Sequence, residues 1–171
     1  MKTRIGLLLV ILAAIGVAAG CGSSDDNQAA EPAGSGYGAP PATTTQAVGQ
    51  ATVSTKTGGL GTYLADADGR TLYLFEKDTG TTSTCSGACA SAWPPFLTTG
   101  APSAAGAAKA DLIGTTTRDD DTVQVTYAGH PLYYYSGDSA PGDTKGQDVE
   151  AFGAEWYALG PSGQAIEEDE S

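Results

Sequence analysis

The residues with the clearest chemical potential form a pattern that occurs twice. Residues 69–78 (GRTLYLFEKD) and 129–138 (GHPLYYYSGD) lie 60 residues apart and share the spacing G-x-x-L-Y-x-(F/Y)-x-x-D. A phenol, a second ring and a carboxylate therefore recur at fixed intervals, as Tyr73, Phe75 and Asp78, and again as Tyr133, Tyr135 and Asp138. Exposed rings beside a carboxylate can bind a sugar or a cationic ligand.

Strand geometry supports a second interpretation of the same motif. In a strand, Tyr73 and Phe75 share one face and Leu72 and Leu74 share the other, so both faces are apolar. We therefore expect a central strand that is covered on both sides. The motif aspartate follows the strand, where a short carboxylate accepts hydrogen bonds from backbone N–H groups and fixes a turn. We favour this core strand, and the exposed binding platform stays as the alternative.

The paired cysteines offer three kinds of chemistry. Cys85 and Cys89 are separated by three residues, and an oxidising compartment favours a disulfide between them. A redox-active pair and a metal site are the alternatives. Zinc prefers four nitrogen or sulfur ligands, whereas the domain has these two cysteines and a single histidine, His130. No nucleophile motif accompanies His130, so we expect it to be a polar residue in a turn. We predict no catalytic residue, no metal and no cofactor.

The N-terminal residues indicate export. Residues 1–20 have a basic start, an apolar run and a small-residue end, as in a signal peptide, and the run of fifteen residues from Ile5 is short for a membrane span of about 20. The sequence AAGC at 18–21 resembles a bacterial lipobox, which predicts lipidation of Cys21. Residues 21–50 then form the lipidated cysteine and a disordered, flexible tether, because they carry too little apolar surface to fold.

The charge restricts the partners of the mature protein. Without the signal segment, six basic residues face twenty acidic ones, so the net charge is −14. This charge argues against nucleic acid and against anionic lipid surfaces. We expect contact with the membrane through the N-terminal lipid alone.

The expected fold is mainly β, a small single domain of two related β-hairpin-containing repeats arranged as a sheet or sandwich. The domain spans 51–166, with repeat 1 at about 58–97, repeat 2 at about 111–163 and an acidic tail at 167–171. Alternating apolar residues and turn signals support this class. The expected elements are a hairpin over 62–75 that turns at Asp68-Gly69, strands at 112–113, 122–127, 132–135 and 156–159, and a helical turn over 86–92.

These motifs together resemble a known family. The repeated motif, the segment Cys85-Ser-Gly-Ala-Cys89 followed by AWPP at 92–95, and the segments QVTY at 124–127, GHPLY at 129–133 and WY at 156–157 are similar to bacterial predicted lipoproteins with a Yx(FWY)xxD motif, also called secreted repeats of unknown function. The resemblance covers about residues 58–163. It implies secretion and lipid anchoring, and it implies no established reaction.

The expected function follows from the export signal and the small acidic domain. We expect a non-catalytic lipoprotein on the extracytoplasmic face of the cell membrane, which binds a cell-wall polymer or another envelope protein. The alternative is a redox or electron-transfer accessory that uses Cys85 and Cys89 or a bound cofactor. A hydrolase built on His130 ranks third.

Overall fold

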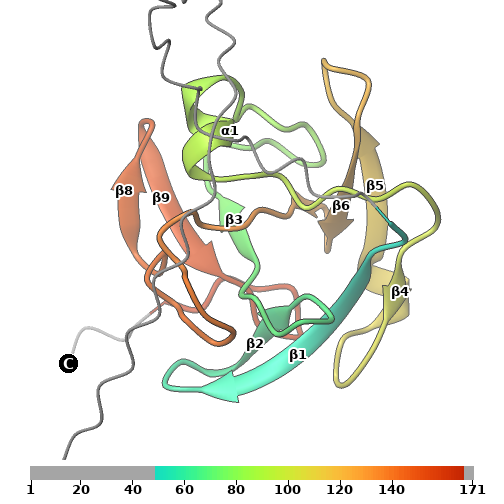
Figure 1. Cartoon of the computed structure of the whole chain (residues 1–171), viewed down its shortest axis with the longest axis vertical. Helices are drawn as coiled ribbons and strands as arrows, with labels where there is room; N and C mark the ends of the chain where they lie inside the picture. The colour runs from blue at the N-terminus through green and yellow to red at the C-terminus, as the bar shows by residue number, and fades with distance from the viewer. Residues whose placement is uncertain (1–48, 168–171) are drawn as a thin grey trace, which may run out of the picture. The chain divides into compact units, whose positions relative to one another are not determined.

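The computed structural model describes residues 49–167 (Figure 1). The predicted signal peptide, Cys21, nearly all of the predicted tether and residues 168–171 of the acidic tail lie outside the described residues. The strands are β1 (Thr52–Gly58), β2 (Gly61–Ala65), β3 (Tyr73–Phe75), β4 (Ser103–Ala104), β5 (Ile113–Thr117), β6 (Val123–Tyr127), β7 (His130–Pro131), β8 (Val149–Ala151) and β9 (Ala154–Ala158).

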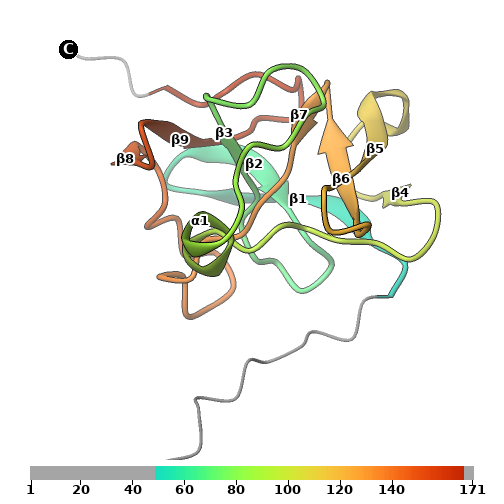
Figure 2. The same ribbon diagram turned by 90° about the horizontal axis from the view of Figure 1, so that it is seen from above.

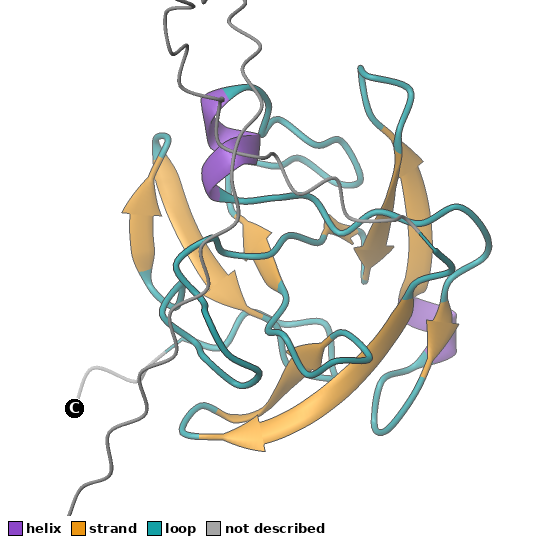
Figure 3. Cartoon of the chain, viewed as in Figure 1, coloured by secondary structure: helices purple, strands orange, loops and turns teal. Residues whose placement is uncertain are grey.

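The described strands form three small sheets, which confirms the mainly β prediction. Their orders are β2-β1-β4, β3-β9-β8 and β5-β6-β7, and β1 and β4 are parallel while the other pairs are antiparallel. Loops join the short strands, and helix within 49–167 is confined to α1 (Ala88–Ala92) and the 3-10 turn η1 (Ala110–Leu112) (Figure 3). None of the helices in this described range is long and apolar enough to cross a membrane.

The two repeats exchange strands. Strand β3 of the first repeat pairs with β9 near the end of the second, with Phe75 opposite Trp156. Reciprocally, the Tyr134 amide of the second repeat donates to the Pro94 carbonyl of the first at 2.8 Å. The two repeats meet where Tyr73 and Tyr133 exchange both backbone hydrogen bonds at 2.9 Å. Figures 1 and 2 show β3 between the β8–β9 hairpin and the β5–β6 hairpin.

Most predicted elements are present, with differences at the motif strands. The predicted hairpin over 62–75 turns at Gly69, where φ is +82°, but its arms join only through the Ala65–Thr71 bridge and the Leu72 amide, before β3 leaves to pair with β9. The predicted strand 132–135 is irregular and pairs with both repeats: the Leu132 amide donates to the Val125 carbonyl, and the Tyr134 amide donates to the Pro94 carbonyl. The predicted helical turn is α1, and the turn after Arg118 closes the β5–β6 hairpin.

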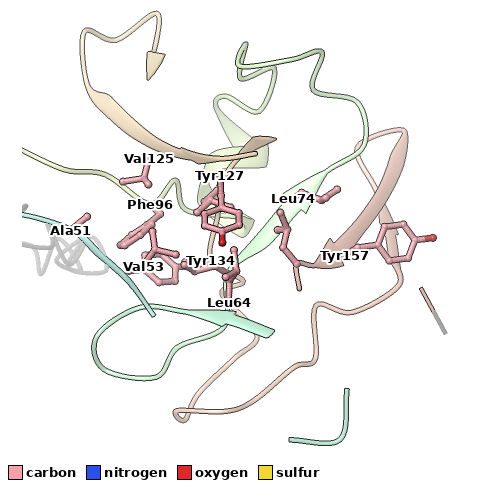
Figure 4. Packing of buried hydrophobic residues seen from close by; sticks show 12 residues of the cluster. Ala51, Val53, Leu64, Leu74, Phe96, Val125, Tyr127, Tyr134 and Tyr157 are labelled. Atoms are coloured by element: carbon pink, nitrogen blue, oxygen red, sulfur yellow. The ribbon is translucent and has the colours of Figure 1, made fainter. Parts of the chain in front are cut away.

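Buried side chains form two clusters on opposite faces of the motif strands. One contains Leu72 and Leu74 with apolar side chains of the hairpins, and Figure 4 shows Leu64, Val53 and Phe96 gathered around Tyr134 in it. The other contains Tyr73 and Phe75 with both tryptophans and the cysteines. Burial on both faces agrees with the expected central strand and explains why the motif alternates without a polar face.

Truncation of a motif ring should lower the free energy of unfolding more at a buried position than at a half-buried one. Phe75 is 2% exposed, so Phe75→Ala should lower the free energy of unfolding by about 3–5 kcal/mol. Tyr135 is half-buried, so Tyr135→Ala should cost less. Urea unfolding followed by circular dichroism measures both. Phe152→Ala, at a ring that is 44% exposed, is the control and should change little. Near-normal stability of Phe75→Ala would contradict the core role.

Candidate functional site

The phenol and carboxylate of each motif bind the opposite repeat. The Tyr73 hydroxyl donates to Asp138 Oδ2 at 2.7 Å, and the Tyr133 hydroxyl donates to Asp78 Oδ2 at 2.6 Å. Both phenols are fully buried. Hydrogen bonds to a carboxylate are stronger than neutral ones, and burial raises the cost of leaving one unmade. The motif therefore forms a reciprocal Tyr–Asp exchange that joins the repeats.

The second oxygen of each aspartate fixes the loop that follows. Asp78 Oδ1 accepts from both the amide and the hydroxyl of Thr84 at 2.7 Å, and Asp138 Oδ1 accepts from the Lys145 amide at 2.9 Å. This confirms that the motif aspartate organises a turn. The sequence did not reveal the cross-repeat phenol, since a donor 55 or 65 residues away leaves no local signal.

Six rings pack together around the exchange. Four of them stack face to face in the order Tyr135, Trp93, Trp156 and Phe75, with centroid distances of 4.3, 4.0 and 4.1 Å. Tyr73 meets Trp93 edge-on at 5.5 Å, and Tyr133 meets Trp156 edge-on at 5.2 Å. Offset stacks and edge contacts are the favourable geometries for aromatic pairs. We call this set the six-ring cluster.

Burial of the motif rings removes the exposed binding platform. Tyr73, Phe75 and Tyr133 are at most 2% exposed, and only Tyr135 reaches solvent in part. Asp78 is 8% exposed. A sugar or cation cannot stack on rings that are already covered, so the platform alternative is wrong for these residues.

A buried arginine extends the Tyr133 side of the exchange. Arg118 donates to Ser83 Oγ at 2.6 Å, and the Ser83 hydroxyl lies 2.7 Å from the Tyr133 hydroxyl. The same guanidinium donates to Gln124 Oε1 and to the Cys85 carbonyl, and its side chain is 6% exposed. Two of these partners, Ser83 and Cys85, lie 35 and 33 residues away in the sequence, so no local pattern indicates the network.

The disulfide lies directly after Ser83 and Thr84 in the chain. Cys85 and Cys89 are bonded, as predicted, and they are 1% and 7% exposed. Their bonded sulfurs are not available as thiolate metal ligands. Among residues 49–167 no group of three or more potential histidine, cysteine or carboxylate ligands is placed to hold a metal ion.

His130 lies at the edge of a small polar cavity. It lines a space of about 270 Å³ together with Glu76 and Asp78. Both oxygens of Asp78 are already bound, one to Thr84 and one to Tyr133. The hydrogen bonds that Asp78 makes therefore fix the loop that follows it and join the two repeats.

A larger groove lies elsewhere, over the β5–β6 hairpin. Its volume is about 420 Å³, and it is lined by Thr99, Gly100, Ala101, Pro102, Ala110, Ile113, Gly114, Thr115 and Val123. All of these side chains are small or uncharged. No sequence motif marks these residues, so the groove was not predicted.

Desolvation shifts the pKa values of the residues in the Tyr–Asp exchange. Burial, with Asp138 as the hydrogen-bond acceptor, raises the pKa of Tyr73, and burial beside Asp78 raises the pKa of Tyr133. Burial also raises the pKa of Asp138, although Tyr73 and the Lys145 amide partly oppose the shift. Both phenols therefore keep their protons well above the pH at which a free tyrosine ionises.

These features define a class of protein: a two-repeat β domain whose halves are joined by exchanged strands and exchanged Tyr–Asp pairs. The sequence profile of a lipoprotein family described as a secreted repeat of unknown function matches residues 54–96 and 114–159, just over half of the chain. The protein belongs to this family. Membership fits an extracellular protein and confirms the two repeats. No curated protein and no solved structure matches the chain.

Alkaline unfolding should report the exchange. Unfolded tyrosines ionise near pH 10.0, while Tyr73 and Tyr133 stay protonated in the fold. Their stabilisation is complete below pH 10 and is lost as pH rises through the folded pKa values, by about 1.4 kcal/mol per pH unit for each phenol. The Tyr73→Phe/Tyr133→Phe variant should therefore show a shallower decline between pH 10 and 11, although it is less stable at neutral pH.

Urea unfolding at each pH measures this slope. Phe75→Leu is the matched control, because it weakens the core and leaves both phenols in place. An unchanged slope in the double phenylalanine variant would contradict the assignment.

Proposed function

We propose that this protein is a lipid-anchored, non-catalytic interaction module on the extracytoplasmic face of the cell membrane, held there through Cys21. The observation that carries the proposal is the reciprocal Tyr–Asp exchange. The phenols and carboxylates of the repeated motif bind one another inside the domain, at 2.6 and 2.7 Å. The motif therefore serves folding, and recognition falls to the outer surface.

The groove over β5 and β6 is the best candidate for that recognition. Its 420 Å³ suit an extended segment with small side chains, and its uncharged lining leaves hydrogen bonding and close packing as the means of selection. The mature chain carries a net charge of −14, which favours a basic partner and steers it by long-range attraction. Of the two expected partners, we therefore favour a basic envelope protein over a cell-wall polymer.

The redox alternative based on the cysteines has weaker support. Reactive cysteines are at least partly exposed, whereas Cys85 and Cys89 are buried in the aromatic cluster. The Cys85 carbonyl also accepts a hydrogen bond from Arg118 at 2.6 Å. These contacts support a disulfide that positions the loop carrying Ser83 and Thr84.

The anchor is tested by Cys21→Ser. Without the thiol no lipid can be attached, so the protein should leave the membrane fraction and keep an unprocessed or misprocessed N-terminus. Fractionation and mass spectrometry of the N-terminus measure both effects. The matched control is Ser24→Ala, three residues away in the same segment, which should leave localisation unchanged. Normal membrane association of Cys21→Ser would contradict lipid anchoring.

The recognition surface is tested by a photo-crosslinking phenylalanine placed at Val123, which lines the groove and is 37% exposed. In intact cells we expect one discrete adduct with a basic envelope protein, identified by mass spectrometry. The control places the same group at Phe152, which is also an exposed apolar position and lies on the β8–β9 turn. Adducts with wall fragments would assign the groove to a polymer, and equal labelling from both positions would refute the groove.

A further inference from the structure

The six-ring cluster forms an unbroken path from solvent to the buried phenols. Tyr135 is half-exposed and lies 4.3 Å from Trp93, which stacks on Trp156 at 4.0 Å with only 4° between the ring planes. Both indoles are at most 1% exposed. Electrons move readily between aromatic rings in contact, and indole and phenol are the protein side chains most easily oxidised by one electron, apart from sulfur.

Each buried phenol also has a built-in proton acceptor. A phenol that loses an electron becomes a strong acid, so its oxidation is favourable only where the proton can leave at the same time. The Tyr73 hydroxyl donates to Asp138 Oδ2 at 2.7 Å, which is within the range for direct proton transfer. Tyr73 also contacts the Trp93 ring at 5.5 Å.

We propose that the six-ring cluster relays a one-electron oxidising equivalent from the surface to Tyr73, which passes its proton to Asp138. The oxidant is a one-electron acceptor at the outer face of the membrane, such as an oxidised metalloprotein. It removes one electron through Tyr135 and leaves a Trp93 radical cation. One electron then moves from Tyr73 to that indole, and the phenolic proton moves to Asp138 Oδ2. The products are neutral Trp93, a neutral Tyr73 radical and a protonated Asp138.

The two halves of the exchange differ in a way that selects Tyr73. On the other side, the Arg118 guanidinium donates to Ser83, which is hydrogen-bonded to Tyr133. This nearby positive charge disfavours removal of an electron from Tyr133. No such chain reaches Tyr73 in the described residues, where the Gly146 amide contacts the hydroxyl at 3.3 Å. Burial of Asp138, which raises its pKa, strengthens it as the proton acceptor.

This activity goes beyond the proposed interaction module and uses neither the cysteines nor a bound cofactor. The rings and carboxylates that carry it also hold the fold, so both roles are compatible. A membrane-anchored relay of this kind would exchange electrons with partners that touch the face around Tyr135.

The test is photochemical oxidation of the purified full chain with tris(bipyridine)ruthenium and persulfate, followed by freeze-quenching and electron paramagnetic resonance. The wild type should give a neutral tyrosyl radical, and Tyr73→Phe should lose it. Asp138→Asn keeps a hydrogen-bond acceptor but removes the base, so the indole radical should persist in its place. Trp93→Phe should slow formation of the tyrosyl signal. Thermal melting of each variant verifies that it is folded.

The matched control is Tyr157→Phe. That phenol also donates to a carboxylate, Glu155 at 2.8 Å, but its ring belongs to the other core cluster. Its loss should leave the signal unchanged. The proposal is overturned if Tyr73→Phe or Asp138→Asn retains the wild-type tyrosyl signal, or if Tyr157→Phe abolishes it.

Discussion

The structure depends on providing hydrogen-bond donors for the two motif carboxylates, because Asp78 is buried and Asp138 is partly buried. Asp78 and Asp138 would destabilise the fold if their oxygens lacked donors. In each, Oδ2 accepts from a phenol of the opposite repeat, and Oδ1 accepts from the loop that follows the aspartate. Neither repeat can supply both. The domain is therefore stable only when the two halves are assembled. The pairing of β3 with β9 makes the backbone hydrogen bonds depend on both halves in the same way.

The repeats are related but are not equivalent, and the difference is physical. The strand pairings align Lys56 and Tyr63 of the first hairpin with Thr116 and Gln124 of the second. Two residues further, Gly58 corresponds to Arg118, and a Cβ at Gly58 would lie 3.1 Å from the Tyr63 hydroxyl. One repeat thus fills this space with a large phenol, and the other fills it with a smaller amide and a buried cation.

Local patterns predicted what local physics determines. The turn at Gly69, strand β6, the apolar alternation around Tyr73 and the Cys85–Cys89 pair all follow from residues near one another in sequence. The exchanged partners could not be predicted in this way, because a symmetric motif does not say whether its tyrosine binds its own aspartate or the other one. The groove over β5 was missed for a different reason, since its walls are small, uncharged residues that carry no motif.

The pairing of β3 with β9 also determines when the domain can complete its fold. Strand β3 at residues 73–75 pairs with residues 156–158. The first half of the domain therefore cannot complete its sheet or its core until nearly the whole chain is present. Contacts so distant in sequence form slowly, because the loop must close before they stabilise anything. In a secreted protein of this kind, the first half of the domain stays incomplete until the C-terminal strand is available to pair with it.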